Sequence, residues 1–168
     1  MTASRVAVVF GSESDWPVME KCVKQLETFG LRPVIEIMSA HRNPERVREF
    51  AANAQSSGLE VVIAGAGMSA ALAGTLAAHT CVPVIGVPVS TGALGGLDAM
   101  LATTQMPPGV PVASVGLDAP GATNAALLAV QILARGDAKL AAAYTTFKAE
   151  QAGAVQARNR ALLDKLGR

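Results

Sequence analysis

The segment SAHRNP at residues 39–44 places an imidazole beside a guanidinium, directly after an apolar run. His41 is one of only two histidines in the chain. A histidine titrates near neutral pH and can therefore carry a proton during a reaction, while Arg42 can bind a phosphate through two parallel hydrogen bonds. A structural histidine is the alternative, and Asn43 and Pro44 are ordinary residues for a helix start. Because the arginine is its neighbour, we expect His41 to be functional.

A second polar segment, GSESD at residues 11–15, follows another apolar run. Its glycine permits a sharp turn, and Ser12 and Ser14 offer hydroxyl and N–H groups where a helix is predicted to begin, a position that favours phosphate. Asp15 could accept hydrogen bonds from a ribose or an amine. Simple helix capping is the alternative for all three side chains. The segment matches neither GK[ST] nor GxGxxG, so it is not one of those phosphate-binding loops.

A third segment, GAGMSAALAG at residues 65–74, contains three glycines and Ser69. Its bare backbone could lie close to a flat ring, or the glycines could serve only tight packing of a strand against a helix. The second histidine, His79, stands near the end of this Ala-rich stretch, where a cation interacts favourably with the helix dipole. We expect His79 to be structural.

These segments follow the strands of a predicted α/β fold. Short apolar runs alternate with helical patterns, which predicts a parallel sheet covered by helices on both faces, a three-layer α/β/α domain. In such sheets the carboxyl ends of the strands meet at one edge, and ligands bind there. We therefore expect GSESD, SAHRNP, GAGMS and PVSTG to lie close together. The predicted strands are 6–10, 34–38, 60–64, 83–87 and 110–115, and the predicted helices are 15–29, 44–57, 69–79, 92–104 and 121–135.

The tail, residues 137–166, has the pattern of one long helix. About 30 residues would span roughly 45 Å, which exceeds the width of the preceding domain body. Such a helix either lies along its own domain or reaches over a neighbouring subunit. The second reading is favoured because only 16% of residues are charged and 51% are hydrophobic, which indicates hidden surface. We expect a single domain over residues 1–168, with an α/β core at 1–136.

Composition and missing motifs exclude several classes of function. A net charge of +1 gives no indication of nucleic acid or of a membrane surface as partner, and the apolar runs are too short to span a bilayer. We expect no signal peptide, and we expect Cys22 and Cys81 to be buried reduced thiols of a cytoplasmic protein. No HExxH, CxxC or GxSxG pattern is present, so neither a metal site nor a serine nucleophile is indicated. This favours a reaction in which the substrate supplies the reactivity and the protein moves one proton.

Several motifs together resemble the PurE family of purine biosynthesis, over nearly the whole chain. They are GSESDW, SAHRNP, AGAG, PVIGVPV, LGGLD, TTQMPPGVPVASVG and GATNAALLAVQILA. The resemblance implies a flavodoxin-like domain in a homo-octamer, with the C-terminal helices packing on neighbours and with no metal or organic cofactor. It also implies transfer of the carboxylate of N5-carboxyaminoimidazole ribonucleotide to ring carbon four, through release and recapture of CO2.

The resemblance further implies a role for each site residue. His41 would be the catalytic proton carrier, and the backbone of residues 64–67 would line the base and carboxylate pocket. Family contacts to phosphate and ribose map onto Ser12, Asp15 and Arg42. The full substrate-binding set is then Ser12, Ser14, Asp15, Ser39, Arg42, Ala66, Gly67 and Ser69.

One loop departs from the family pattern. The usual bacterial mutase reads GGAAHLPG where this chain reads GMSAALAG, so the family's second histidine falls on Ala71. Met68 and Ser69 resemble instead the relatives that carboxylate aminoimidazole ribonucleotide directly with CO2, and Ser69 could bind the carboxylate. Three hypotheses remain: the mutase, a direct carboxylase of this or a related heteroaromatic nucleotide, and a non-catalytic nucleotide-binding module. His41 argues against the third, since binding alone does not require it.

Overall fold

Five parallel strands form one sheet in the computed structural model, which describes residues 4–168. Their order is β2–β1–β3–β4–β5, so β1, β3 and β4 are interior strands and β2 and β5 are the edge strands. The predicted parallel α/β fold is therefore confirmed. The strands are β1 (Val6–Phe10), β2 (Val34–Ile37), β3 (Val61–Gly67), β4 (Val84–Val89) and β5 (Ala113–Ser114).

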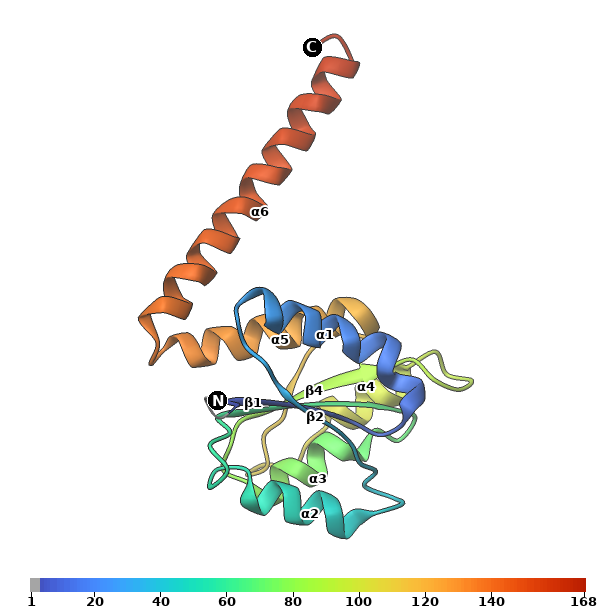
Figure 1. Ribbon diagram of the computed structural model, residues 1–168. Helices are drawn as coiled ribbons and strands as arrows, with labels where there is room; N and C mark the ends of the chain where they lie inside the picture. Colours follow the sequence, from blue (N-terminus) through green and yellow to red (C-terminus); the bar gives the residue numbers. More distant parts are fainter. Residues whose placement is uncertain (1–3) are drawn as a thin grey trace.

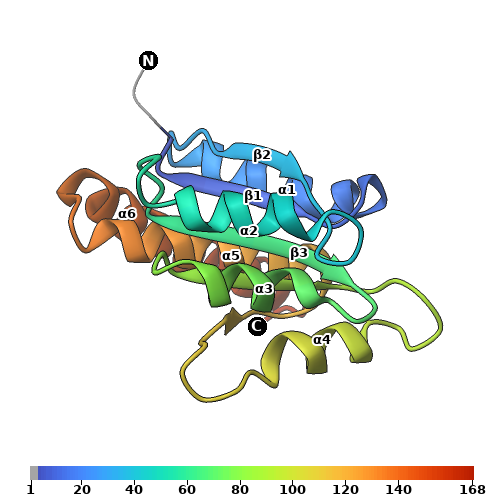
Figure 2. The same cartoon turned by 90° about the horizontal axis from the view of Figure 1, so that it is seen from below.

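Helices cover both faces of this sheet and complete the three layers (Figures 1 and 2). On one face lie α1 (Trp16–Thr28), which follows the short 3-10 helix η1 (Glu13–Asp15), and α5 (Asp118–Ala134). The other face is covered by α2 (Pro44–Asn53), α3 (Ala71–His79) and α4 (Leu97–Thr104). Each of these helices comes after a strand and runs back from the carboxyl ends of the strands towards their amino ends. Parallel pairing requires such a connection between successive strands.

The central strands are apolar throughout because both of their faces are buried. Along β1, Val8 and Phe10 belong to the core under α1 and α5, whereas Ala7 and Val9 belong to the core under α2 and α3. Successive side chains of a strand point to opposite faces, so a strand with two covered faces has no polar position. These uninterrupted runs are what made the strands recognisable in the sequence.

Several element boundaries differ from those predicted. The third strand was expected to end at residue 64, but β3 continues to Gly67, which pairs with Val89 of β4. The helix expected at residues 92–104 begins at Leu97, because Gly92, Gly95 and Gly96 all have positive φ and form a loop. Other differences include shorter elements at β5 and α2, an earlier start of α5 and a later end of β4.

The long C-terminal helix is confirmed as a single element, α6 (Ala138–Lys165). It projects away from the body of the domain, so it does not lie along its own sheet and helices (Figure 1). Asp137 caps its first turn and pairs with Arg5 at 2.8 Å, while Tyr144 and Phe147 pack on Phe29. All residues from 148 to 168 are exposed in the single chain.

Two further observations concern expectations drawn from composition. No helix within residues 4–168 is both long enough and apolar enough to cross a membrane. Cys22 is buried, and this burial raises the pKa of its thiol to about 12, so it is inert at neutral pH. Cys81 is exposed, and the expectation that both thiols are buried was therefore wrong.

Candidate active site

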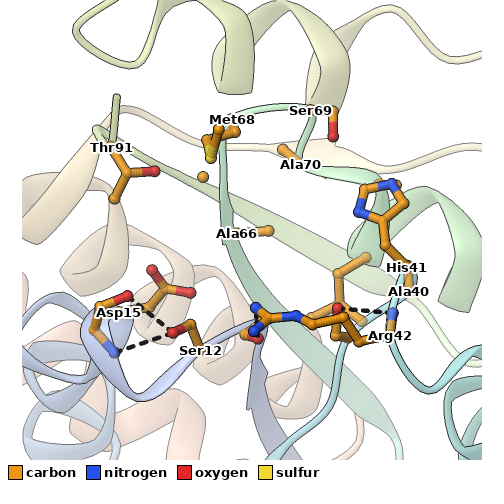
Figure 3. Close-up of a pocket in the computed structure, with 16 residues that line it drawn as sticks. Ser12, Asp15, Ala40, His41, Arg42, Ala66, Met68, Ser69, Ala70 and Thr91 are labelled. Carbon is orange, nitrogen blue, oxygen red and sulfur yellow. Dashed lines mark hydrogen bonds between the residues drawn. The ribbon is translucent and has the colours of Figure 1, made fainter. Parts of the chain in front are cut away.

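A cavity of about 370 Å³ opens at the carboxyl edge of the sheet, where β1, β2, β3 and β4 end (Figure 3). The register of the strands explains this convergence. The Gly11 N–H donates to the Gly65 carbonyl at 3.1 Å, and the Met38 N–H donates to the Phe10 carbonyl at 3.0 Å. The loops after the first three strands therefore leave the sheet at the same level and surround one space.

The nine side chains and backbone positions selected from the sequence all line this cavity. The expectation that they come together at one edge of the sheet is therefore confirmed. They are His41, Ser12, Ser14, Asp15, Ser39, Arg42, Ala66, Gly67 and Ser69.

The serines of the first loop cap a helix and line the cavity at the same time. The Ser12 hydroxyl is the N-cap acceptor of η1, where it accepts from the Ser14 N–H at 3.4 Å and from the Ser14 hydroxyl at 3.0 Å. Since η1 leads directly into α1, the loop places polar hydroxyls at the start of a helix. Capping and ligand binding are therefore compatible here.

Asp15 is the only buried carboxylate found among residues 4–168, with a relative exposure of 3%. Burial raises the pKa of this carboxyl, because desolvation penalises the charged form. Backbone hydrogen bonds from Ser12 and Gly11 and the positive charge of Arg42 oppose the shift without cancelling it. The free protein thus maintains a carboxylate that is poorly solvated and ready to accept hydrogen bonds from a ligand.

Asp15→Asn is expected to stabilise the free protein at neutral pH. The pKa of Asp15 is higher in the folded state than its ordinary value of 3.8, so the folded state holds the proton more tightly and loses stability as the pH rises through that window. The amide has no charge to desolvate. Thermal unfolding should therefore give a higher Tm for Asp15→Asn at pH 7, with the difference shrinking towards pH 3.8. An equal difference at both pH values would contradict this origin.

The turn that carries His41 and Arg42 is closed by Asn43. The Asn43 side chain accepts from the Ser39 N–H at 2.6 Å, the Asn43 N–H donates to the Ser39 carbonyl at 3.0 Å, and the Arg42 N–H donates to the Ser39 hydroxyl at 3.2 Å. Asn43 occupies the N-cap position of α2, but its side chain makes no capping bond to that helix. It fixes the turn that carries His41 and Arg42 instead, which is a different role from the one predicted.

The side chains of His41 and Arg42 are both exposed and line the cavity. The Arg42 guanidinium extends towards Ser12, where its only hydrogen bond to the described residues is a long one, 3.4 Å, to the Gly11 carbonyl (Figure 3). Within residues 4–168 it forms no ion pair, unlike Arg5, Arg46 and Arg48. Such a free guanidinium, beside two serine hydroxyls, is suited to an anionic ligand.

The glycines of β3 serve both of the purposes considered from the sequence. A Cβ on Gly65 would lie 2.4 Å from the sulfur of Met19, so this glycine is required for packing against α1. A Cβ on Gly67 would lie 1.9 Å from the Thr91 hydroxyl oxygen. Gly67 therefore presents bare backbone to the cavity and allows the loop after β4 to approach.

The loop after β3 has an unusual backbone. Met68 and Ala70 have φ values of 55° and 39°, in the left-handed region that non-glycine residues rarely adopt. Such conformations cost of order 1–3 kcal/mol each and are found preferentially at functional sites. They place Ser69 near His41 on one side of the cavity, while Ala71 contributes a small apolar surface (Figure 3).

Sequence reasoning missed Thr91 and Ala40 as cavity residues. Thr91 lies in PVSTG, which was expected at this edge, but nothing in the segment distinguished its hydroxyl from that of Ser90. His79 lies outside the cavity, at the end of α3. No three His, Cys, Asp or Glu side chains gather as a metal-binding group in the described part of the chain.

A family model, curated relatives and a solved structure that resemble this chain all belong to one protein family. The family model described as AIR carboxylase matches residues 5–154. The N5-carboxyaminoimidazole ribonucleotide mutase of Pyrococcus abyssi is 54% identical over 77% of this chain and 73% of its own length. The Mycobacterium tuberculosis mutase is 47% identical over 92% and 88%. The crystal structure of Treponema denticola PurE superposes with a TM-score of 0.83 at 29% identity, covering 94% of this chain and 97% of that one.

Proposed function

Because this chain belongs to the AIR carboxylase family of PurE proteins, we propose that it acts in purine biosynthesis as an N5-carboxyaminoimidazole ribonucleotide mutase. The reaction moves the carboxylate from the exocyclic nitrogen of the substrate to ring carbon four. The observation that carries this proposal is the single cavity that contains His41, Arg42 and the serine loop. The extent of the similarity to mutases, across most of both chains, supports the same activity.

The charges around the cavity suggest how the nucleotide lies. The phosphate would bind between Arg42, Ser12 and Ser14, since these supply a free cation and hydroxyls. Asp15 would accept hydrogen bonds from the ribose. The aminoimidazole ring would lie on the backbone of Ala66 and Gly67, where no large side chain intervenes.

The chemistry then requires one movable proton. As the N–C bond to the carboxylate breaks, CO2 forms and the amine nitrogen takes up a proton, which protonated His41 would donate. Ring carbon four attacks the CO2, a C–C bond forms, and the proton on that carbon is transferred to His41. Holding CO2 beside the ring avoids a bimolecular encounter, an effect that can be worth about 7–11 kcal/mol. Ser69, which lies on the same side of the cavity as His41, would bind the carboxylate (Figure 3).

Direct carboxylation of aminoimidazole ribonucleotide is the second candidate. The observation in its favour is the loop at residues 68–71, where Met68 and Ser69 replace the usual mutase residues and Ala71 brings no second histidine to the cavity. A Ser69→Ala variant with unchanged kinetics would eliminate carboxylate binding by this serine.

A paired assay tests the proposal. The protein is given either N5-carboxyaminoimidazole ribonucleotide alone or aminoimidazole ribonucleotide with bicarbonate, and formation of the carbon-linked carboxylate is followed. Efficient turnover of the first substrate supports the mutase. Turnover of the second alone identifies a carboxylase, and reaction of neither shows that the family scaffold here serves another substrate.

We also propose that the chain is a cytoplasmic homo-oligomer, an octamer by analogy with the family. Apolar side chains that a monomer would leave in water support an assembly. Ile35 and Ile37 of the edge strand are 45% and 49% exposed, and Leu162 on the projecting end of α6 is 54% exposed. Surfaces of this kind usually mark a contact between proteins.

Deleting residues 150–168 is expected to lower the number of subunits in the assembly, because this part of α6 would pack on a neighbouring subunit. The fold of the single chain should persist, since the deleted residues are all exposed in it. Light scattering measures the particle mass directly. The matched control is Gln156→Ser, which changes an exposed polar residue of α6 and should leave the mass unaltered. A truncated protein with full assembly mass would contradict a role for α6 between subunits.

A further inference from the structure

We propose that Thr91 is a further substrate-contacting residue, which recognises a ribose hydroxyl, and that the contact between Ser90 and Asp118 holds it in position. The inference rests on the proposed function and extends it to a residue outside the predicted site. Thr91 lies in the loop after β4 and lines the same cavity as His41 and Arg42.

Thr91 is held against the floor of the cavity. Its hydroxyl oxygen lies close to the backbone of Gly67. A Cβ built on Gly67 would be only 1.9 Å from this oxygen. Its own N–H donates to the Val89 carbonyl at 3.0 Å, which turns the chain sharply after the strand. Within residues 4–168 the hydroxyl itself has no hydrogen-bond partner, so it is available to a ligand.

The neighbouring charge determines which part of a nucleotide suits this position. Thr91 and Asp15 lie on the same side of the cavity, whereas His41 and Ser69 lie on the opposite side and Arg42 extends between them (Figure 3). On the Thr91 side of Asp15, away from the Arg42 guanidinium, a phosphate or carboxylate would be repelled by the Asp15 carboxylate (Figure 3). A sugar hydroxyl can donate to Asp15 and exchange a second hydrogen bond with Thr91, so the two residues together suit a ribose diol.

The loop that carries Thr91 is fixed by an unusual contact. The Asp118 carboxylate, on the first residue of α5, accepts from the Ser90 N–H at 2.8 Å and from the Ser90 hydroxyl at 2.5 Å. Asp118 has a φ of 54°, a conformation that is costly for a residue other than glycine. Two hydrogen bonds to a charged acceptor offset that cost and fix the residue immediately before Thr91. Asp118 is therefore a positioning residue.

The test measures preference for ribose. Calorimetry gives the affinity for aminoimidazole ribonucleotide and for its 2′-deoxy and 3′-deoxy analogues. Thr91→Val, which keeps the shape and removes the hydroxyl, should weaken binding of the ribonucleotide about 3- to 10-fold and abolish the preference over one deoxy analogue. Thr91→Ser, the matched control, should retain that preference.

The positioning role of Asp118 is tested by combining its substitution with that of Thr91 in a double-mutant cycle. Asp118→Gly removes both acceptors, while glycine adopts the same φ without strain, so the fold is expected to persist. It should reduce the preference for ribose in the unaltered protein and add nothing in a Thr91→Val background. Ser90→Ala provides a second variant that leaves α5 untouched.

Failure of the proposed role of Thr91 can be distinguished from failure of the proposed function. If the ribonucleotide binds and Thr91→Val keeps full preference over both deoxy analogues, the role of Thr91 is wrong while the proposed function stands. If Asp118→Gly and Ser90→Ala both retain the preference, the positioning role is wrong. If the unaltered protein binds no aminoimidazole ribonucleotide, the proposed function and this inference fail together.

Discussion

His41→Asn is expected to lower kcat by about 10²–10⁴-fold while leaving nucleotide affinity close to that of the unaltered protein. Asparagine can still form hydrogen bonds, but it cannot accept the proton that leaves ring carbon four. His41 is exposed at the surface of the cavity and is not part of the core, so its replacement should not disturb the fold. Steady-state kinetics and calorimetry on the same preparation separate the two effects.

The other histidine provides the control for this substitution. His79 is also exposed, but it ends α3 and does not line the cavity, so His79→Asn should retain full activity. If His41→Asn keeps its turnover, His41 is not the proton carrier. If it loses binding to the same degree as turnover, its role lies in holding the substrate.

Arg42→Ala is expected to weaken binding of the nucleotide by about 10- to 150-fold, the usual effect of losing a hydrogen bond between charged groups. The guanidinium forms no ion pair with the described residues, so its removal breaks no salt bridge, although it takes away a positive charge that partly stabilises the Asp15 carboxylate. The loss should be specific for the phosphate. Calorimetry with aminoimidazole ribonucleotide and with its nucleoside makes this comparison.

Arg48→Ala is the matched control for Arg42→Ala. Arg48 lies on α2 and pairs with Glu45 at 3.1 Å, away from the cavity, so its removal changes the net charge equally without touching the site. Nucleotide affinity should remain unchanged in this variant. If Arg42→Ala weakens the nucleoside as much as the nucleotide, Arg42 does not bind the phosphate.

The strands that are buried on both faces could be predicted from the sequence. The extent of the edge strand β5 could not, because it depends on how far that strand pairs with β4. β1, β3 and β4 are continuous apolar runs, and each was found close to its observed position. The predicted strand at 110–115 is reduced to Ala113–Ser114, which pairs with Ile85 and Gly86 of β4. Pro111 has no N–H for the ladder, which limits extension of the pairing towards Val110.

The candidate site was predictable because its residues follow strands that must end at one edge. That argument identified His41, Arg42 and the serine loop without any knowledge of side-chain contacts. It could not identify Thr91, whose place in the cavity depends on the close approach of Gly67 and on the contact of Ser90 with Asp118. It also missed that Asn43 closes the turn at Ser39, because this choice of partner is a property of the folded chain.

The helical pattern of the tail predicted its length but not its direction. Leu140 is buried in the core under α5, and Tyr144 and Phe147 contact Phe29, so the first turns belong to the domain. Beyond residue 147 the helix has no surface of its own chain to cover. The sequence pattern of the leucines beyond residue 147, Leu162, Leu163 and Leu166, does not indicate which surface would bury them.

The most direct test of the central claim follows the fate of the carboxylate. N5-carboxyaminoimidazole ribonucleotide carrying a carbon isotope label in its carboxyl group is incubated with the protein in unlabelled bicarbonate, and the first product formed is analysed by mass spectrometry. Transfer within a closed cavity predicts that the label is retained in the carboxylate on ring carbon four. Product whose label is diluted to the level of the surrounding bicarbonate would contradict the mutase and indicate capture of CO2 from solution.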